Sequence, residues 1–371
     1  MHNVRRKPRI YDESVYHDFG LQPDIFEIKL GNALIPLVDS KEGAPLLKEI
    51  SYLRNQFDAE YGFLLPKIRI RDSMFIKPDE YVFLINGSEV AGSSVKPGHY
   101  FCLDTGSVSK PLDYPNLKKT KDPAFGMDCY ILPEKDVEKA KVTGYVCVSP
   151  ERMIGTHFHE IIRKNITRLL NQTMVNELVE KVRKINPDVI TDVFITKGFS
   201  ISDMKIVLNR LLEEYISIRD MNTILETIAD YLKEERNPLV LAEKVRERLA
   251  PCFIKAYAED GKKLHFFRIS QYVSETLLEH MYYPESKIER PYLALDPADR
   301  KRLVDGLSKS CKWFTEHDLP PVFICVSVIR PFVADYLHGD FPGVHVVSDI
   351  ELYAAKNLIT VNLEGEVTFD D

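Results

Sequence analysis

The sequence of 371 residues lacks any hydrophobic run that approaches the roughly 18–20 apolar residues of a membrane-spanning helix. Its first residues, MHNVRRKPRIYDES, carry charges but no apolar segment, which excludes a secretory signal peptide. An excess of basic residues is missing as well. The net charge is −7, whereas a general nucleic-acid binder needs a basic surface, so we expect no nucleic-acid partner.

Cysteine is sparse, and its spacing is uninformative for metal binding. The six cysteines form no C-x-x-C pair. In a chain of this size, such scattering is typical of reduced, mostly buried thiols in a reducing compartment. The cysteines lie at positions 102, 129, 147, 252, 311 and 325.

Linear catalytic motifs are also absent. The sequence contains no G-x-x-x-x-G-K-[ST], no G-x-G-x-x-G and no G-x-S-x-G, the patterns that hold nucleotide phosphates or a nucleophilic serine. These absences favour a binding or assembly protein with no catalytic residue and no cofactor. Sites assembled from distant residues leave no such motif, so a soluble metal- or nucleotide-dependent enzyme is the alternative that the sequence leaves open.

Residues 155–162, GTHFHEII, place two histidines and a glutamate within a few positions and raise the question of a metal site. The apolar residues that follow keep helical spacing, and on a helix His157 and His159 point roughly 200° apart. The zinc motif H-E-x-x-H fails because arginine occupies its last position. We therefore expect no metal, and predict a helix that starts with Thr156 as N-cap and Glu160 in its first turn.

The N-terminal part is predicted to be mixed α/β. Residues 45–61 carry apolar side chains every three to four positions, which predicts a helix that Gly62 ends. Ile68 and Ile70 alternate with arginines, which is typical of a half-buried strand. The Asn-Gly pair at 86–87 lies between two extended runs and predicts a hairpin, because both residue types tolerate positive φ.

The middle of the chain changes character twice. Residues 98–149 are rich in proline and glycine and contain only short strand-like runs, which predicts a small β-rich insertion. From 153 to about 250 helical spacing dominates, with Ser202 and Ser217 as predicted N-caps of two of the helices. The predicted apolar face of an earlier helix consists of Met174, Leu178, Val182 and Ile185.

The last third alternates between strands and helices. The segments LHFFRI, VFICVSV, VHVV and LITVNL predict strands, and Asp296-Pro297 predicts the start of a helix that extends to about residue 317. This order predicts a second α/β unit. The expected fold class is therefore α+β with several subdomains: an α/β platform, a small β-rich insertion, a helical subdomain and a C-terminal α/β subdomain.

Several segments, taken together, resemble the cytoplasmic domain of the large export-gate protein of type III secretion systems, a family with flagellar and injectisome members. The resemblance extends from about residue 21 to 250 and continues more loosely through RPFVADYL and VVSDIEL. The ending, SDIEL followed by ITVNLEGEV, favours the injectisome branch. The segments that carry the resemblance are LLPKIRIRD (64–72), PDEYVFLINGSEVA (78–91), DPAFGM (122–127), THFHEIIRKN (156–165) and SIRDMNTILETIAD (217–230).

The resemblance implies boundaries for the subdomains. It also implies that residues 1–20 are a juxtamembrane linker after a membrane-spanning part, at the cytoplasmic face of the bacterial inner membrane. The implied subdomains are a platform of 21–97 and 150–172, an insertion of 98–149, a helical subdomain of 173–250 and a C-terminal α/β subdomain of 251–371.

The same resemblance implies a function without an active site. Family members are expected to form a homo-oligomeric, nonameric ring below the export channel. The ring is expected to receive complexes of secretion chaperones with their substrates, to contact a gatekeeper protein and the stalk of a separate ATPase, and to pass substrates to the membrane channel.

In flagellar members, a docking dimple uses the aspartate and phenylalanine of D-P-A-F-G and the threonine of T-H-[LF]. These match Asp122, Phe125 and Thr156, so the resemblance implies that Phe125 is an apolar anchor with the other two as polar groups at its rim. Phe158 and Met127 stand where the family usually has leucine. From the sequence alone, Phe125 could equally be a loop anchor buried in its own core.

Arg219 and Asp220 precede the apolar helix of the last matching segment. On their own they are interpreted as an exposed capping pair, which contributes about 0–1 kcal/mol as an ion pair. The resemblance places this helical subdomain at the ring interface, where the same charges would set the register between subunits.

Overall fold

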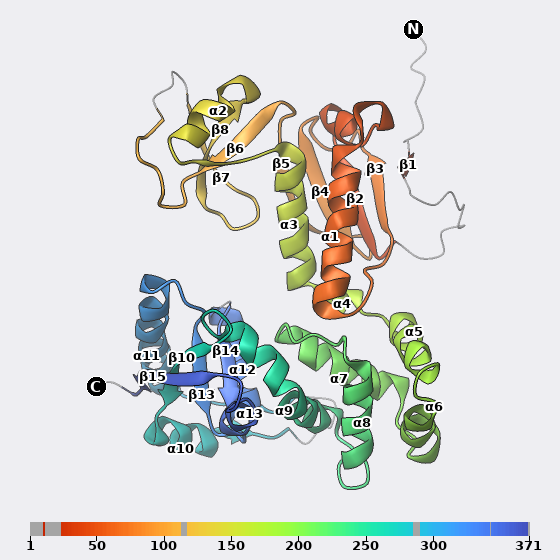
Figure 1. Ribbon diagram of the computed structural model, residues 1–371, viewed down its shortest axis with the longest axis vertical. Helices are drawn as coiled ribbons and strands as arrows, with labels where there is room; N and C mark the ends of the chain where they lie inside the picture. The colour runs from red at the N-terminus through yellow and green to blue at the C-terminus, as the bar shows by residue number, and fades with distance from the viewer. Residues whose placement is uncertain (1–9, 12–23, 113–116, 285–289, 342, 370–371) are drawn as a thin grey trace. The chain divides into compact units, whose positions relative to one another are not determined.

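The computed structural model describes residues 10–11, 24–112, 117–284, 290–341 and 343–369. The chain forms two compact units, Met1–Met174 and Val175–Asp371 (Figure 1). Helices and several sheets occur together, which confirms the expected fold class. The described helices include none with the length and apolar character of a membrane span.

The first unit contains a five-stranded sheet in the order β1-β3-β2-β4-β5. The pair β2–β3 is parallel and the other neighbours are antiparallel. Asn86 and Gly87 join β4 to β5 with φ angles of 50° and 78°, which confirms the predicted hairpin. The strands are β1 (Ile10–Tyr11), β2 (Phe26–Leu30), β3 (Ile68–Asp72), β4 (Glu80–Ile85) and β5 (Ser88–Ser94). Apart from Ile10–Tyr11, the expected linker of residues 1–20 lies outside the described residues.

Two helices, α1 (Pro45–Tyr61) and α3 (Pro150–Lys164), pack against each other beside this sheet (Figure 1). As predicted, α1 ends at Gly62, which takes a φ of 89° that favours glycine. The two helices approach closely at Gly155, where a Cβ atom would lie 2.7 Å from Cγ of Glu49. The shorter helices of this region are η1 (Asn32–Leu37), η2 (Ser40–Glu42) and α4 (Ile166–Leu169).

Residues from His99 to Val148 form a second, four-stranded sheet in the order β7-β8-β6-β9, with all neighbours antiparallel. Its elements are β6 (His99–Leu103), β7 (Lys118–Lys121), β8 (Asp128–Pro133), α2 (Glu134–Val142) and β9 (Val146–Val148). Its small core consists of Cys102, Leu132, Ala140 and Tyr145. The β-rich character read from the sequence is present, with one short helix besides.

The following segment is helical, and two of its predicted caps are wrong. Ser200 rather than Ser202 caps α7, because its hydroxyl accepts from the amide of Asp203 at 3.0 Å. Asp220 rather than Ser217 caps α8, because α8 begins at Met221 and the carboxylate of Asp220 accepts from the amide of Thr223 at 3.0 Å. The helices are α5 (Gln172–Arg183), α6 (Pro187–Ile190), η3 (Thr191–Thr196), α7 (Ile201–Glu213), α8 (Met221–Tyr231) and α9 (Pro238–Tyr257).

The predicted apolar face of α5 is also partly wrong. Ile185 is 83% exposed, because α5 ends at Arg183 and the helical period does not continue past it. The buried face consists of Val175, Leu178, Val179 and Val182.

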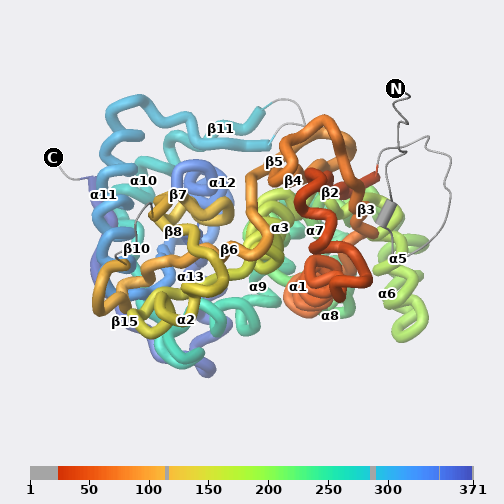
Figure 2. The backbone as a smooth tube through the Cα atoms, turned by 90° about the horizontal axis from the view of Figure 1, so that it is seen from above, coloured from red at the N-terminus to blue at the C-terminus, as the bar shows by residue number. Residues whose placement is uncertain are grey.

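The C-terminal part has a four-stranded parallel sheet in the order β14-β13-β10-β15. Asp296 caps α11 as predicted, since its carboxylate accepts from the amides of Ala298 and Asp299 at 2.8 Å each. Both views place α6 at one end of the second unit and α10 and α11 at the other (Figures 1 and 2). The strands are β10 (Lys263–Ile269), β11 (Met281–Tyr282), β12 (Tyr292–Leu293), β13 (Val322–Cys325), β14 (His345–Ser348) and β15 (Thr360–Val367). The helices are α10 (Gln271–Glu279), α11 (Pro297–Glu316), α12 (Arg330–Asp340) and α13 (Asp349–Ala354).

Candidate docking site

The D-P-A-F-G segment forms the turn between β7 and β8, and a buried carboxylate holds it. Asp122 is 3% exposed. One of its oxygens accepts from the amides of Ala124 and Phe125 at 3.0 and 2.8 Å, and the other from the amide of Met127 at 2.6 Å. Gly126 has a φ of 71°, which favours glycine. Asp122 therefore builds the turn from inside, and its role as a polar group at the rim of a docking dimple stays a prediction.

Phe125 points outward from this turn. Its side chain is 58% exposed, and that of Met127 is 43% exposed, whereas Ala124 between Asp122 and Phe125 is buried. The alternative in which Phe125 is a buried loop anchor is therefore wrong. Phe125 and Met127 are thus two neighbouring exposed apolar side chains on a turn whose backbone is held by Asp122.

Basic residues flank the apolar pair. Lys119 and Lys121 both pair with Asp128, at 2.8 and 3.3 Å, and their hydrogen bonds hold the pKa of that carboxyl below its usual value. Lys121 also donates to the carbonyl of Gly126 at 3.0 Å. Two ammonium groups therefore lie at the rim of the turn and share one exposed carboxylate.

Thr156 lies in the middle of α3, so its predicted role as N-cap is wrong. The helix begins at Pro150, with Ser149 as the N-cap residue, because buried Met153 and Ile154 extend the apolar face toward the N-terminus. Glu160 is accordingly far from the first turn. The half-buried Thr156 donates its hydroxyl hydrogen to the carbonyl of Arg152 at 2.9 Å, which leaves its oxygen to act as an acceptor toward a partner.

A buried histidine joins α3 to β4. His157 is 5% exposed, and its Nδ1 lies 2.8 Å from the hydroxyl oxygen of Tyr81 in β4. Burial lowers the pKa of His157 to about 4, with a further lowering from Lys164 and an opposing effect of Asp122. The carboxylate of Asp122 also helps to raise the pKa of Tyr81, after burial. The D-P-A-F-G turn thus lies within electrostatic range of the part of α3 that carries Thr156.

His157 and Phe158 of GTHFHEII have structural roles. His157 is engaged with Tyr81, and the described residues contain no group of three or more histidine, cysteine, aspartate or glutamate side chains that could hold a metal ion. Phe158 is fully buried and packs edge-on against Phe26, with ring centroids 5.2 Å apart. The substitution of the family's leucine at this position therefore affects the core and not the exposed patch.

Sequence reasoning missed the contact between Tyr81 and His157. The two residues lie 76 positions apart, so no local pattern joins them. One signal was present: His157 precedes Phe158 in a segment whose apolar residues keep helical spacing, and a histidine on such a face needs a buried hydrogen-bond partner.

Arg219 and Asp220 belong to the second unit, whereas the D-P-A-F-G turn and Thr156 belong to the first. Both are exposed, and the carboxylate of Asp220 accepts from the amide of Thr223 at 3.0 Å. The capping interpretation of Asp220 is confirmed. The role of the two charges in a ring stays a prediction.

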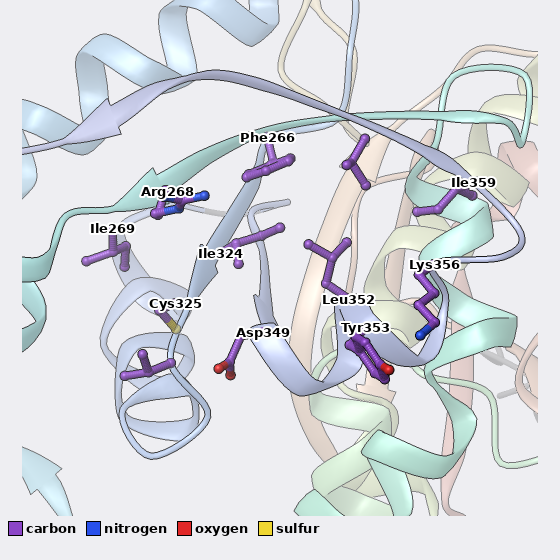
Figure 3. A pocket seen from close by; sticks show the side chains of 12 residues that line it. Phe266, Arg268, Ile269, Ile324, Cys325, Asp349, Leu352, Tyr353, Lys356 and Ile359 are labelled. Atoms are coloured by element: carbon purple, nitrogen blue, oxygen red, sulfur yellow. The ribbon is translucent and has the colours of Figure 1, made fainter.

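A pocket of about 470 Å³ lies on the C-terminal sheet, between the strands and α13 (Figure 3). Its lining is mostly apolar. Asp349 at its edge accepts from the amide of Ser327 at 3.0 Å, and burial raises the pKa of the Cys325 thiol.

Residues 4–357 match the FHIPEP family. The chain belongs to this family. It is the family of type III secretion export-gate proteins that the quoted segments resemble. The flagellar biosynthesis protein FlhA of Helicobacter pylori is 31% identical over 342 residues, a match that covers 92% of this FHIPEP chain and 45% of the relative. The chain thus spans about half the length of the curated relatives that it matches.

Solved structures share the fold of this FHIPEP chain. The Chlamydia pneumoniae CdsV protein has a TM-score of 0.79 at 21% identity, over 95% of this chain and 99% of that one. The same protein in complex with CdsO has a TM-score of 0.78 at 20% identity, over 95% of this chain and 99% of that one. The nonameric EPEC SctV-C has a TM-score of 0.74 at 20% identity, over 94% of this chain and 100% of that one. Because the family includes flagellar and injectisome members, the injectisome branch stays a prediction.

Proposed function

We propose that this chain is the cytoplasmic ring module of a type III export gate, which docks complexes of chaperones with their substrates and passes the substrates to the membrane channel. The observation that carries the docking function is the 58% exposure of Phe125 on a turn that the buried Asp122 fixes from inside. An exposed aromatic side chain is a common energetic centre of an interface.

The geometry of the turn favours tight binding. The backbone around Phe125 is held by bonds to one carboxylate before any partner arrives, so little conformational entropy is lost on docking. Lys119 and Lys121 add positive charge beside the anchor, which favours an acidic surface on the partner. Thr156 would add a hydrogen-bond acceptor from α3.

Assembly into a ring is the second part of the proposal. A structure with the same fold is a nonamer, which supports a ring of copies of this chain at the cytoplasmic face of the bacterial inner membrane. The complex of CdsV with CdsO shows that a protein of this fold binds another protein, which supports the ATPase stalk and the gatekeeper protein as further partners. Arg219 and Asp220 are the proposed charges at the ring interface.

The test of docking compares two exposed phenylalanines of the first unit. Phe125→Ala removes the proposed anchor, and Phe75→Ala removes a fully exposed side chain from the loop between β3 and β4. Calorimetry with the cognate chaperone–substrate complex should show a loss of at least about 2 kcal/mol for Phe125→Ala, the size of an interface hot spot. Phe75→Ala should bind like wild type.

Both variants should keep the wild-type circular dichroism spectrum, because both side chains lie largely outside the core. Wild-type affinity of Phe125→Ala would contradict the docking proposal. Equal losses of affinity in Phe125→Ala and Phe75→Ala would point to a general effect of exposed aromatic side chains. That result would also contradict the docking proposal.

A further inference from the structure

The inserted sheet brings together two cysteines that are 45 residues apart in the sequence. Cys102 lies in β6 and Cys147 in β9, and the two are directly opposite in the antiparallel ladder. Their sulfur atoms are 3.0 Å apart. Because a disulfide bond is about 2.05 Å long, the two thiols are adjacent but not bonded.

We propose that Cys102 and Cys147 are a modification site, at which a low-molecular-weight disulfide such as glutathione disulfide oxidises the two thiols to a cross-strand disulfide. The strand pairing meets the geometric requirement. Opposite residues of antiparallel strands have Cα atoms about 4.5 or 5.5 Å apart, and disulfides join Cα atoms about 4.4–6.8 Å apart. The bond therefore forms without a large movement of either strand.

Exposure decides which thiol reacts first. Cys147 is half-buried, whereas Cys102 is fully buried, and burial raises the pKa of its thiol. Cys147 loses its proton to solvent, and its thiolate attacks one sulfur of glutathione disulfide. The sulfur–sulfur bond of that molecule breaks, one glutathione thiolate leaves, and a mixed disulfide remains on Cys147.

Cys102 completes the reaction. Its thiol loses a proton and attacks Sγ of Cys147, and the second glutathione leaves as the bond between the two protein sulfurs forms. The two cysteines have then given up two electrons and two protons, and one glutathione disulfide has become two glutathione thiols. Excess glutathione or dithiothreitol reverses both steps.

The bond would join the two strands through which the insertion is connected to the rest of the first unit. β6 is the first strand of the insertion, and β9 ends at Val148, next to the start of α3. The loop closed by the bond contains Phe125. The modification is nevertheless independent of the proposed docking function, because it is detected as a covalent bond and not as a change in affinity.

The experiment uses the full chain with Cys252→Ser, which removes an exposed thiol that could link two molecules. The protein is incubated with mixtures of reduced and oxidised glutathione, quenched with acid, alkylated with N-ethylmaleimide and digested for mass spectrometry. Cys102 and Cys147 should lose reactivity together, in a linked peptide that dithiothreitol separates. Cys129→Ser is the matched control, since this buried thiol lies in the same sheet, and it should keep the link.

Cys102→Ser should stop at the mixed disulfide on Cys147. If that variant does not fold, Cys147→Ser tests the other cysteine, at the less buried position. In this variant Cys102 should stay a free thiol, which N-ethylmaleimide alkylates once the protein is unfolded. Two outcomes overturn the proposal. One is that Cys102 and Cys147 both remain alkylatable under conditions in which Cys252 of the wild-type chain has become glutathionylated. The other is a linked peptide that joins Cys102 to Cys129.

Discussion

Arg330, at the start of α12, forms an ion pair with both carboxylate oxygens of Glu214, which follows the last turn of α7. Nη1 of Arg330 lies 3.1 and 2.8 Å from these oxygens, and the other edge of the guanidinium contacts Glu243 of α9 at 2.7 and 2.5 Å. Arg246 adds a second pair of contacts, to Glu214 and Glu351, at 2.7 Å each. The helices of the second unit are thus joined to its C-terminal sheet region by buried charges.

Arg330→Met should strongly destabilise the second unit. Arg330 is 1% exposed, and its loss removes the nearest cation from Glu243 and one of the two close arginines from Glu214. Breaking a buried pair from one side costs about 3–5 kcal/mol. Urea unfolding followed by the fluorescence of Trp313, the single tryptophan and a residue of the second unit, measures this loss.

The control for this change is Arg300→Met, which removes an exposed pair with Asp340 at 3.4 Å. Its urea midpoint should stay close to that of wild type, because exposed pairs contribute little. A wild-type midpoint for Arg330→Met would show that the buried pairs contribute no more than the exposed one. That result would remove the proposed link between the helices and the sheet.

The first unit should lose stability as pH falls from about 6.5 to about 4. Burial first, and Lys164 second, lower the pKa of His157 from 6.5 to about 4. In this pH window the unfolded chain binds a proton that the folded chain does not, so acid favours unfolding by up to about 3 kcal/mol. His157→Asn stays neutral in both states, and its amide oxygen can still face Tyr81. Its stability should therefore change less with pH.

Hydrogen exchange of peptides from α3 and β4, between pH 4.5 and 7, measures this difference after correction for the intrinsic exchange rate. His317→Asn is the control, because it lies in the second unit and should leave the pH dependence of the first unit unchanged. An equal pH dependence in wild type and His157→Asn would show that the histidine titrates alike in both states.

Some elements could be predicted from the sequence because their signals are local. Gly62 ends α1 and Asp296 starts α11 through their own backbone and side-chain preferences. The start of α3 was missed because Thr156 is a plausible cap in isolation, while the apolar face continues to Met153. Packing against the core decides where the helix begins, and therefore which residue becomes its N-cap. Local sequence alone does not contain that information.

The candidate site could be predicted only in part, for the same reason. The resemblance pointed to Asp122 and Phe125. In the sequence, however, an aspartate that organises a turn cannot be distinguished from an aspartate that faces a partner. The pair Arg330–Glu214 joins residues 116 positions apart, and no periodicity encodes it. Such contacts depend on how the elements pack.

Asp122 should act on docking through the position of Phe125. In Asp122→Asn one oxygen can still accept from Ala124 and Phe125, but the new amide group places a donor against the amide of Met127. Losing a hydrogen bond to a charged group costs about 1.5–3 kcal/mol. Exchange of the amides of the turn should accelerate, and affinity for the chaperone–substrate complex should fall.

A double-mutant cycle with Phe125→Ala separates positioning from contact. If Asp122 acts only through Phe125, then Asp122→Asn should have little further effect on affinity once the aromatic side chain is gone. Losses that add in full would assign Asp122 a direct contact with the partner, contrary to its burial.

Arg219 and Asp220 allow a capping role to be separated from a role in the ring. Asp220→Ala removes the acceptor for the amide of Thr223 and should destabilise the second unit by about 1 kcal/mol. Asp220→Ser keeps a good N-cap and removes only the charge, and Arg219→Ala removes a charge without touching the cap. Both should unfold like wild type in urea.

If these charges set the register between subunits, Asp220→Ser and Arg219→Ala should form fewer rings than wild type at equal concentration in mass photometry. The reason is that a ring uses two different surfaces of each subunit, so one mismatched charge is repeated at every interface around it. Wild-type assembly of both variants, together with the stability loss of Asp220→Ala, would leave the pair with a capping role alone and place the ring contact elsewhere on the chain.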